Sequence, residues 1–425
     1  MNKKIFIILL SGILNISSAW GTALSSIQKY PPRIQPAHFV SYVINNSSNG
    51  YDLHIAAISK NSPQVIFDNV ISLLQSPYVK TVFDTTNVAH IIVAEATPLG
   101  TNPILNYIQY NPWTAQQSTV NIMAGFSSNE SAEMATITIG TDPNGAAQPF
   151  IAFVTLNHQT SERILYIASL QGQQWATLNI LKFTNLSLFI NQFADFLDIT
   201  VNNGFAEIMY YYRVALPPVL PLIGKIDIDL KNNVIQQDND FGKTSVNFQD
   251  CCTALGSSHA GYTGTIQNNI FYRVYFREKG PNNVYSNPIA ITSAQNRAIL
   301  EGLVNEFNVA GFLINEANTT NQMDELKLYL YVNQTKLVEY NLFQYDPRTQ
   351  NFFVTAKDIG QRLNRQDPLG SFHIVALIGQ PTGQRTFDFY LVFMNVAGGK
   401  IISITPVSSL LNHSGSGFLY VNVSD

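Results

Sequence analysis

The clearest repeated pattern of the chain begins with the run Ala135-Thr136-Ile137-Thr138-Ile139, turns at Thr141-Asp142-Pro143-Asn144-Gly145, and ends with Phe150-Ile151-Ala152-Phe153-Val154. β-Branched and aromatic residues in the two runs suit the pleated surface of a strand. The turn between them favours reversal of the chain, because Asn and Gly tolerate a positive φ. The stretch is therefore predicted to be an antiparallel hairpin.

Variants of this hairpin recur along the chain. Their second runs start near residues 54, 90, 150, 207, 270, 327 and 373, and polar loops lead most of them into a third and a fourth strand. Four-stranded units that repeat at roughly 40–60 residues are typical of propeller blades. We therefore predict an all-β fold, a β-propeller of seven blades with six as the alternative. The C-terminal run at 417–423 is expected to complete a blade that the N-terminus begins.

A few short helical insertions are also predicted. Apolar residues recur at helical spacing in residues 292–307, and Ser62-Pro63 opens a second such segment that continues to Leu74. Residues 185–197 and 356–364 fit either a helix or a strand. We interpret all four segments as covers for blade edges and not as a second domain.

The N-terminus has the order of residues found in a secretory signal. Lys3 and Lys4 precede a mostly apolar segment at residues 5–16, which is too short to span a membrane, and small residues follow it. We predict a signal peptide at residues 1–21, an extended lead-in at 22–38, and a single β-propeller domain at 39–425. The expected location is secreted, periplasmic or at the cell surface of a bacterium, with no transmembrane helix.

Composition narrows the range of partners. Charged residues make up 12% of the chain and the formal net charge is −4, with no basic patch. Nucleic acid is therefore excluded as a partner. The chain contains no H-E-x-x-H, Walker A or G-x-S-x-G motif, and no cofactor is predicted.

The repeated unit resembles the blades of the sialidase-like, Asp-box class of β-propellers. The turns Asp142-Pro143-Asn144-Gly145 and Asn203-Gly204 carry most of the resemblance. Ser169-Leu170-Gln171-Gly172-Gln173-Gln174-Trp175 is similar to the Asp box S-x-D-x-G-x-T-W, but it is one residue short and has Gln in place of the aspartate. The resemblance implies the propeller architecture and transfers no activity, because one fold hosts many functions.

Three functions are consistent with the sequence, and the preferred one is an exported binding protein for an unknown protein or carbohydrate ligand. Its predicted ligand contacts are Tyr211, Tyr212, Arg213, Arg277 and Tyr285, because Tyr and Arg anchor interfaces. The first alternative is a glycosidase- or lyase-like enzyme in the propeller channel. That enzyme would need the arginines at 213, 273 and 277 to grip a carboxylate, with Glu207 or Glu95 as the acid. The second alternative, an outer-membrane β-barrel, fits the low charge and the tyrosine content.

Two further groups of residues invite chemistry. Cys251 and Cys252 are the two cysteines of the chain, and they either close a vicinal disulfide, stay as thiols or pair between chains. His54, His90 and His373 open the second runs of three repeats, so they form a weak alternative metal site. The preferred interpretation is that each histidine bonds to its own hairpin and that no metal is bound.

Overall fold

A computed structural model gives the fold. It describes residues 37–45, 50–59, 64–73, 77–95, 100–171, 174–183, 186–187, 197–214, 221–238, 241, 253–255, 259–266, 271–280, 284–295, 298–306, 309–318, 320–332, 335–345, 353–362, 371–383, 386–397, 400–406, 410–411 and 418–423. All the regular secondary structure within these ranges is β-strand. The signal peptide and most of the lead-in predicted at 22–38 lie outside the described residues.

The described strands form seven antiparallel sheets, numbered here 1 to 7 along the chain. Sheet 1 contains β29 (Phe418–Val423), β1 (Ala37–Asn45), β2 (Tyr51–Ser59) and β3 (Val65–Leu73). Sheet 2 contains β4 (Pro77–Phe83), β5 (Ala89–Glu95), β6 (Ile104–Asn111) and β7 (Gln116–Asn121). Sheet 3 contains β8 (Glu130–Thr141), β9 (Ala147–Asn157), β10 (Arg163–Gln171) and β11 (Gln174–Phe183).

The second half of the ring follows the same plan. Sheet 4 contains β12 (Leu186–Ser187) and β13 (Leu197–Asn202), which both pair with β14 (Phe205–Val214), and then β15 (Pro221–Asp229) and β16 (Val234–Asp238). Sheet 5 contains β17 (Thr253–Leu255), β18 (His259–Ile266), β19 (Phe271–Glu278) and β20 (Ile289–Ala290). Sheet 6 contains β21 (Ala298–Glu306), β22 (Val309–Asn318), β23 (Met323–Val332) and β24 (Thr335–Tyr345). Sheet 7 contains β25 (Phe353–Arg362), β26 (Ser371–Gly383), β27 (Thr386–Ala397) and β28 (Lys400–Pro406).

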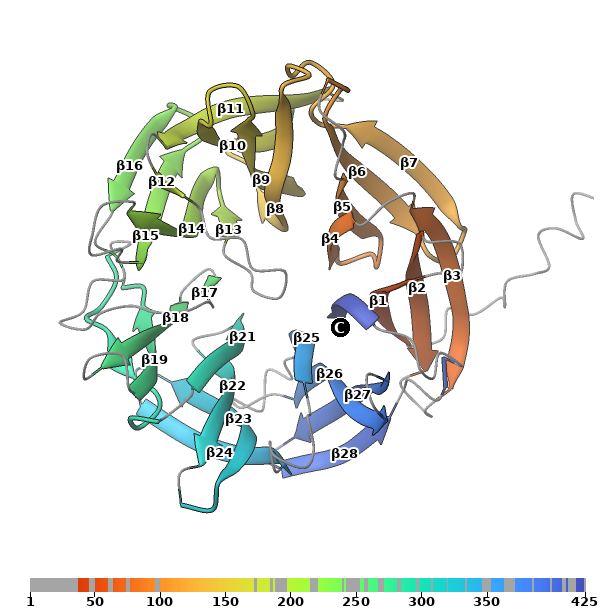
Figure 1. Cartoon of the computed structure of the whole chain (residues 1–425), viewed down its shortest axis with the longest axis vertical. Helices are drawn as coiled ribbons and strands as arrows, with labels where there is room; N and C mark the ends of the chain where they lie inside the picture. The colour runs from red at the N-terminus through yellow and green to blue at the C-terminus, as the bar shows by residue number, and fades with distance from the viewer. Residues whose placement is uncertain are drawn as a thin grey trace, which may run out of the picture.

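The sheets stand in a ring, with strands such as β4, β8, β13 and β21 near the centre and β3, β7, β16 and β24 at the outside (Figure 1). The prediction of an all-β propeller is therefore confirmed. The ring closes through β29, because Val423 lies opposite Val40 and Phe418 opposite Ile44 in an antiparallel pair. One sheet thus contains both ends of the described chain.

The apolar runs of the sequence are explained by burial on both faces of a sheet. One cluster of buried side chains lies between sheets 1 and 2, another between sheets 2 and 3, a large one spans sheets 3, 4 and 5, and another joins sheets 5 and 6. Strand β9 shows the result, because seven consecutive residues from Pro149 to Thr155 are all buried. A strand covered from both sides has no need for polar alternation.

The predicted hairpin at 135–154 forms as β8 and β9, and an aspartate shapes its turn. Asp142 Oδ1 accepts hydrogen bonds from the backbone N–H groups of Asn144 and Ala146, each at 2.8 Å. Asp84 Oδ1 makes the same two bonds between β4 and β5, to Thr86 N at 2.8 Å and Val88 N at 2.9 Å. The carboxylate thus replaces backbone partners that the turn lacks.

The predicted helical insertions are wrong. Residues 62–74 contain β3, and residues 292–307 contain β21. β-Branched and aromatic residues in Val65–Leu73 favour a strand, and buried Ile71 and Leu73 pack between sheets 1 and 2. Both of the ambiguous segments contain strands as well, β12 and β25. Within the described ranges no helix is long and apolar enough to cross a membrane.

The predicted alignment of the repeats is wrong in three sheets. The hairpins β1–β2, β18–β19 and β22–β23 join the second and third strands of their sheets, whereas β4–β5, β8–β9 and β13–β14 join the first and second. Hairpins at both positions have similar strands and turns, so the sequence pattern did not separate them.

Candidate functional site

The candidate site is built around a carboxylate inside the interface between sheets 4 and 5. Glu207 lies in β14 and is 5% exposed. Asp227 stands directly opposite it in β15, two residues beyond Lys225. A buried carboxylate is unfavourable unless cations or hydrogen-bond donors surround it. Charged residues inside an otherwise apolar strand therefore indicate that each buried charge has a partner of opposite charge or a hydrogen-bond donor nearby.

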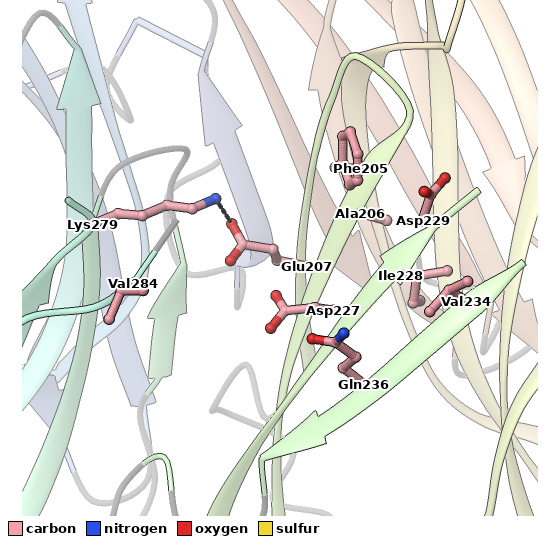
Figure 2. A pocket seen from close by; sticks show the side chains of 10 residues that line it. All are labelled: Phe205, Ala206, Glu207, Asp227, Ile228, Asp229, Val234, Gln236, Lys279 and Val284. Atoms are coloured by element: carbon pink, nitrogen blue, oxygen red, sulfur yellow. Dashed lines mark hydrogen bonds and ion pairs between the residues drawn. The ribbon is translucent and has the colours of Figure 1, made fainter. Parts of the chain in front are cut away.

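Two lysines hold Glu207. Lys225 Nζ donates to Glu207 Oε1 at 3.0 Å and also to Oδ1 of Asp227. Lys279 follows β19 of sheet 5, and its Nζ donates to Glu207 Oε2 at 2.5 Å (Figure 2). The two carboxylates thus share one buried ammonium group, and the second ammonium group bridges two sheets.

The pKa values of Glu207 and Asp227 shift in opposite directions. Burial alone would raise the pKa of Glu207, but the ammonium groups of Lys225 and Lys279 outweigh burial, so this pKa lies below its ordinary value. Burial raises the pKa of Asp227, and the nearby charge of Glu207 raises it further against the effect of Lys225. Glu207 is therefore the ionised member of the pair, and Asp227 is the member that holds a proton more readily.

Aromatic rings lie close to the cationic groups of Lys225 and Arg277. Lys225 Nζ lies 5.0 Å from the ring centroid of Tyr285 and 5.8 Å from that of Phe241. The guanidinium carbon of Arg277 lies 4.9 Å from the centroid of Phe241 on the same interface. Burial, and then the charges of Glu207 and Asp227, raise the pKa of Tyr285. These contacts are close enough for cation–π attraction.

Glu207, Asp227 and Lys279 of this cluster border a pocket of about 390 Å³ (Figure 2). It is lined by Phe205, Ala206, Glu207, Asp227, Ile228, Asp229, Val234, Gln236, Lys279 and Val284. The volume falls in the range of small-molecule pockets, about 300–1,000 Å³. Three apolar side chains of the lining are exposed, with Phe205 at 54%, Val234 at 48% and Val284 at 69%.

The last strands of sheets 4 and 5 are short. β16, the last strand of sheet 4, has five residues and all of them are exposed. β20, which ends sheet 5, has two residues, Ile289 and Ala290. Val234 and Gln236 of β16 line the pocket.

Two of the predicted ligand contacts lie in this interface. Tyr285 pairs with Lys279 in an isolated β-bridge, and Arg277 lies two residues before Lys279. Tyr211, Tyr212 and Arg213 belong to the same strand as Glu207, opposite Ile223, Leu222 and Pro221, but their side chains lie outside the described set. All five ligand contacts stay predictions.

His54 and His90 each have local partners. His54 Nδ1 lies 3.0 Å from Asp68 Oδ1, and His90 Nδ1 lies 2.7 Å from the Tyr107 hydroxyl and Nε2 3.3 Å from Asp84 Oδ2. His54 is on the third strand of its sheet and His90 on the second, so the two positions do not match.

The metal site and the disulfide stay predictions. The side chain of His373, in β26, and both Cys251 and Cys252 lie outside the described residues. No group of three or more His, Cys, Asp or Glu side chains among those that are described is arranged to hold a metal ion.

Sequence reasoning named Glu207 as a possible acid and Arg277 and Tyr285 as ligand contacts, but it missed Lys225, Asp227 and Lys279. Lys225 and Asp227 lie in the run Ile223-Gly224-Lys225-Ile226-Asp227-Ile228, where charges interrupt a buried strand. That interruption is a usable signal. Nothing in the sequence indicated that Lys279, 72 positions along the chain, would meet Glu207.

The chain is a β-propeller protein, and comparison with known proteins adds distant structural similarity. No protein-family model matches the chain, and no curated protein sequence matches it. An α-L-arabinofuranosidase from Fusarium graminearum is 8% identical over 79% of this chain and 94% of that one, with a TM-score of 0.40.

Two further solved structures show the same level of similarity. A polysaccharide lyase is 9% identical over 88% of this chain and 89% of that one, with a TM-score of 0.48. A hypothetical selenium-binding protein from Sulfolobus tokodaii is 9% identical over 93% and 94%, with a TM-score of 0.45. Identities this low with TM-scores below 0.5 assign no activity to this chain.

Proposed function

We propose that the protein is an exported carbohydrate-binding protein that takes a sugar into the pocket between sheets 4 and 5. The observation that carries the proposal is the lining of this pocket. Carboxylate oxygens of Glu207 and Asp227, the amide of Gln236 and the ammonium group of Lys279 all border the same space as the exposed ring of Phe205.

A sugar matches such a lining. Its hydroxyl groups both donate and accept hydrogen bonds, so carboxylate, amide and ammonium groups are all suitable partners. Its C–H faces are apolar and pack against aromatic and aliphatic side chains. Phe205 and Val284 are exposed side chains of these two kinds in the lining. The buried ion pairs would hold the polar groups in place before the ligand arrives.

The proposal also includes export of the protein and an architectural relationship to sialidase-like propellers. The predicted signal peptide at residues 1–21 would place the protein outside the cytoplasm, where polymeric sugars are met. The aspartate-shaped turns at Asp84 and Asp142 support a relationship to sialidase-like propellers in architecture.

A glycan array followed by calorimetric titration tests the binding function. The best glycan would be titrated into the wild type, Phe205→Ala and Val120→Ala, the last being a control because Val120 is 45% exposed on β7 of another sheet. Loss of an aromatic contact should weaken binding about tenfold in Phe205→Ala, and Val120→Ala should bind as the wild type does. Absence of any glycan ligand, or equal affinity in all three proteins, would overturn the proposal.

Glycoside hydrolysis is the second candidate, favoured by the pair formed by Glu207 and Asp227. Glycosidases generally need one carboxylic acid and one carboxylate near the same bond. The opposed pKa directions of the two residues fit that division, with Asp227 as acid and Glu207 as carboxylate. Release of reducing ends from the bound glycan, abolished in Asp227→Asn while binding persists, would support it. Binding without any release would exclude it.

A further inference from the structure

The pocket contains more negative than positive charge. Its lining holds the carboxylates of Glu207, Asp227 and Asp229 and the ammonium group of Lys279. Lys225 lies outside this lining and pairs with Glu207 and Asp227. Both lysines bond to Glu207, and Asp227 has only a share of Lys225. The two aspartates are therefore less compensated than Glu207, and the charge of nearby Lys231 also favours the ionised form of Asp229.

Asp229 bonds to neutral groups. Its Oδ1 accepts from the backbone N–H groups of Lys231 and Asn232 at 3.0 and 3.1 Å, and its Oδ2 accepts from the Asn232 side-chain amide at 2.7 Å. These bonds shape the turn between β15 and β16 and leave the formal charge of Asp229 in place. Lys231, in the same turn, is exposed.

The two aspartates point to the same side of the sheet, beside an aromatic ring. Asp227 and Asp229 are two residues apart in β15, and both line the pocket. Phe205 lies opposite Asp229 in the register of β14 and β15, and Glu207 lies opposite Asp227. A stripe of carboxylates thus runs next to an exposed aromatic face.

We infer that the sugar bound here is an amino sugar, whose ammonium group lies against Asp227 and Asp229 and whose ring packs on Phe205. The inference rests on the proposed function and specifies its ligand. An ammonium group donates charge-assisted hydrogen bonds to carboxylates and is also attracted to the face of an aromatic ring. An acidic sugar would bring a like charge to the same carboxylates, which is unfavourable.

Matched oligosaccharides that differ only at the nitrogen test the inference. A glucosamine tetramer and a galactosamine tetramer, each with its fully N-acetylated counterpart, would be titrated by calorimetry at low and at high salt. The free-amine form should bind about tenfold more tightly at low salt, because hydrogen bonds to charged groups are stronger than neutral ones. The difference should shrink at high salt, as expected for partly exposed charges.

Variants locate the effect. In Asp227→Asn and Asp229→Asn the ratio of the affinities for the free amine and for the N-acetylated form should fall toward one, whatever each substitution does to the affinity for the N-acetylated form. Asp84→Asn is the control, because Asp84 also accepts hydrogen bonds from backbone N–H groups of a turn but belongs to sheet 2 and does not line the pocket. Thermal unfolding of each variant would show that the fold is retained.

The outcomes separate the inference from the proposed function. Equal or tighter binding of the N-acetylated form, or a preference that persists in both aspartate variants, overturns the amino-sugar inference and leaves sugar binding intact. Binding of other sugars from the array with no binding of any tetramer overturns the inference as well. Failure of every glycan to bind overturns the proposed function itself.

Discussion

Lys279 Nζ lies 2.5 Å from Oε2 of Glu207 and thereby links two neighbouring sheets of the propeller. The carboxylate also neutralises Lys225, whose side chain is 5% exposed. One glutamate therefore compensates two cations inside an interface between sheets. The same glutamate borders the pocket, so stability and recognition meet at one residue.

Removal of Glu207 should be more harmful than removal of Lys279. Glu207→Ala removes a partner from two ammonium groups at once, because Lys279 loses its bond to Glu207 and Lys225 keeps only Asp227. Breaking a buried ion pair costs about 3–5 kcal/mol. Lys279→Ala leaves Glu207 paired with Lys225, so the loss in unfolding free energy should be clearly smaller. Urea denaturation of both variants measures the difference, and an equal loss in the two would contradict the asymmetry.

The raised pKa of Asp227 makes a prediction about pH. In the folded protein Asp227 binds its proton more readily than in the unfolded chain, so its contribution to stability is present at acidic pH and is lost as the pH rises through the folded pKa. Asp227→Asn removes this loss. The unfolding free energy of the variant relative to wild type should therefore increase between pH 3 and pH 7. The increase should begin near the ordinary pKa of Asp, about 3.9, at which the unfolded chain loses its proton. A relative stability that is flat or falls across this range would contradict the assignment.

Gly204 is required where two sheets approach each other at their turns. It has a φ of +77°, and a Cβ at this position would lie 2.5 Å from Cγ of Pro143 in sheet 3. Gly145 has a similar φ of +81°, but no atom lies within 4 Å of the position its Cβ would take. Gly145→Ala should lose about 1–2 kcal/mol from backbone strain alone, and Gly204→Ala should lose about 1–3 kcal/mol more from the steric clash. Chemical denaturation of both variants tests this, and equal losses would show that the approach of the sheets is unimportant.

Deletion of the C-terminal strand should open the ring. β29 pairs with β1 and provides an edge of sheet 1. A chain that ends after residue 417 loses those backbone hydrogen bonds and exposes an unpaired strand edge, which favours aggregation. Deletion of residues 424–425 alone is the control. Size-exclusion chromatography and thermal unfolding compare the two, and identical behaviour would mean that β29 does not close the ring.

Much of the fold could be predicted from the sequence, because turn chemistry and strand composition are local signals. The hairpin shaped by Asp142 and the closing strand β29 are examples. The strand at 292–307 was missed because its apolar residues also fit helical spacing, and only packing between sheets decides between the two. Whether a hairpin such as β22–β23 forms the first and second or the second and third strands of its sheet depends on neighbours that are distant in sequence.

The candidate site was less predictable for a related reason. Arg277 and Tyr285 were chosen for their residue types, whereas Lys225 and Asp227 were overlooked because charges in a buried strand were not weighed. The meeting of Lys279 with Glu207 depends on how sheets 4 and 5 pack. Such a contact becomes visible only when the arrangement of the sheets is known.

A crystal structure of the protein with its best glycan from the array is the most direct test of the central claim. We expect electron density for a sugar ring between Phe205 and Val284, with polar contacts to Glu207, Asp227 or Lys279. A glycan bound elsewhere, for example at the centre of the ring of sheets, with the pocket between sheets 4 and 5 unoccupied, would contradict it.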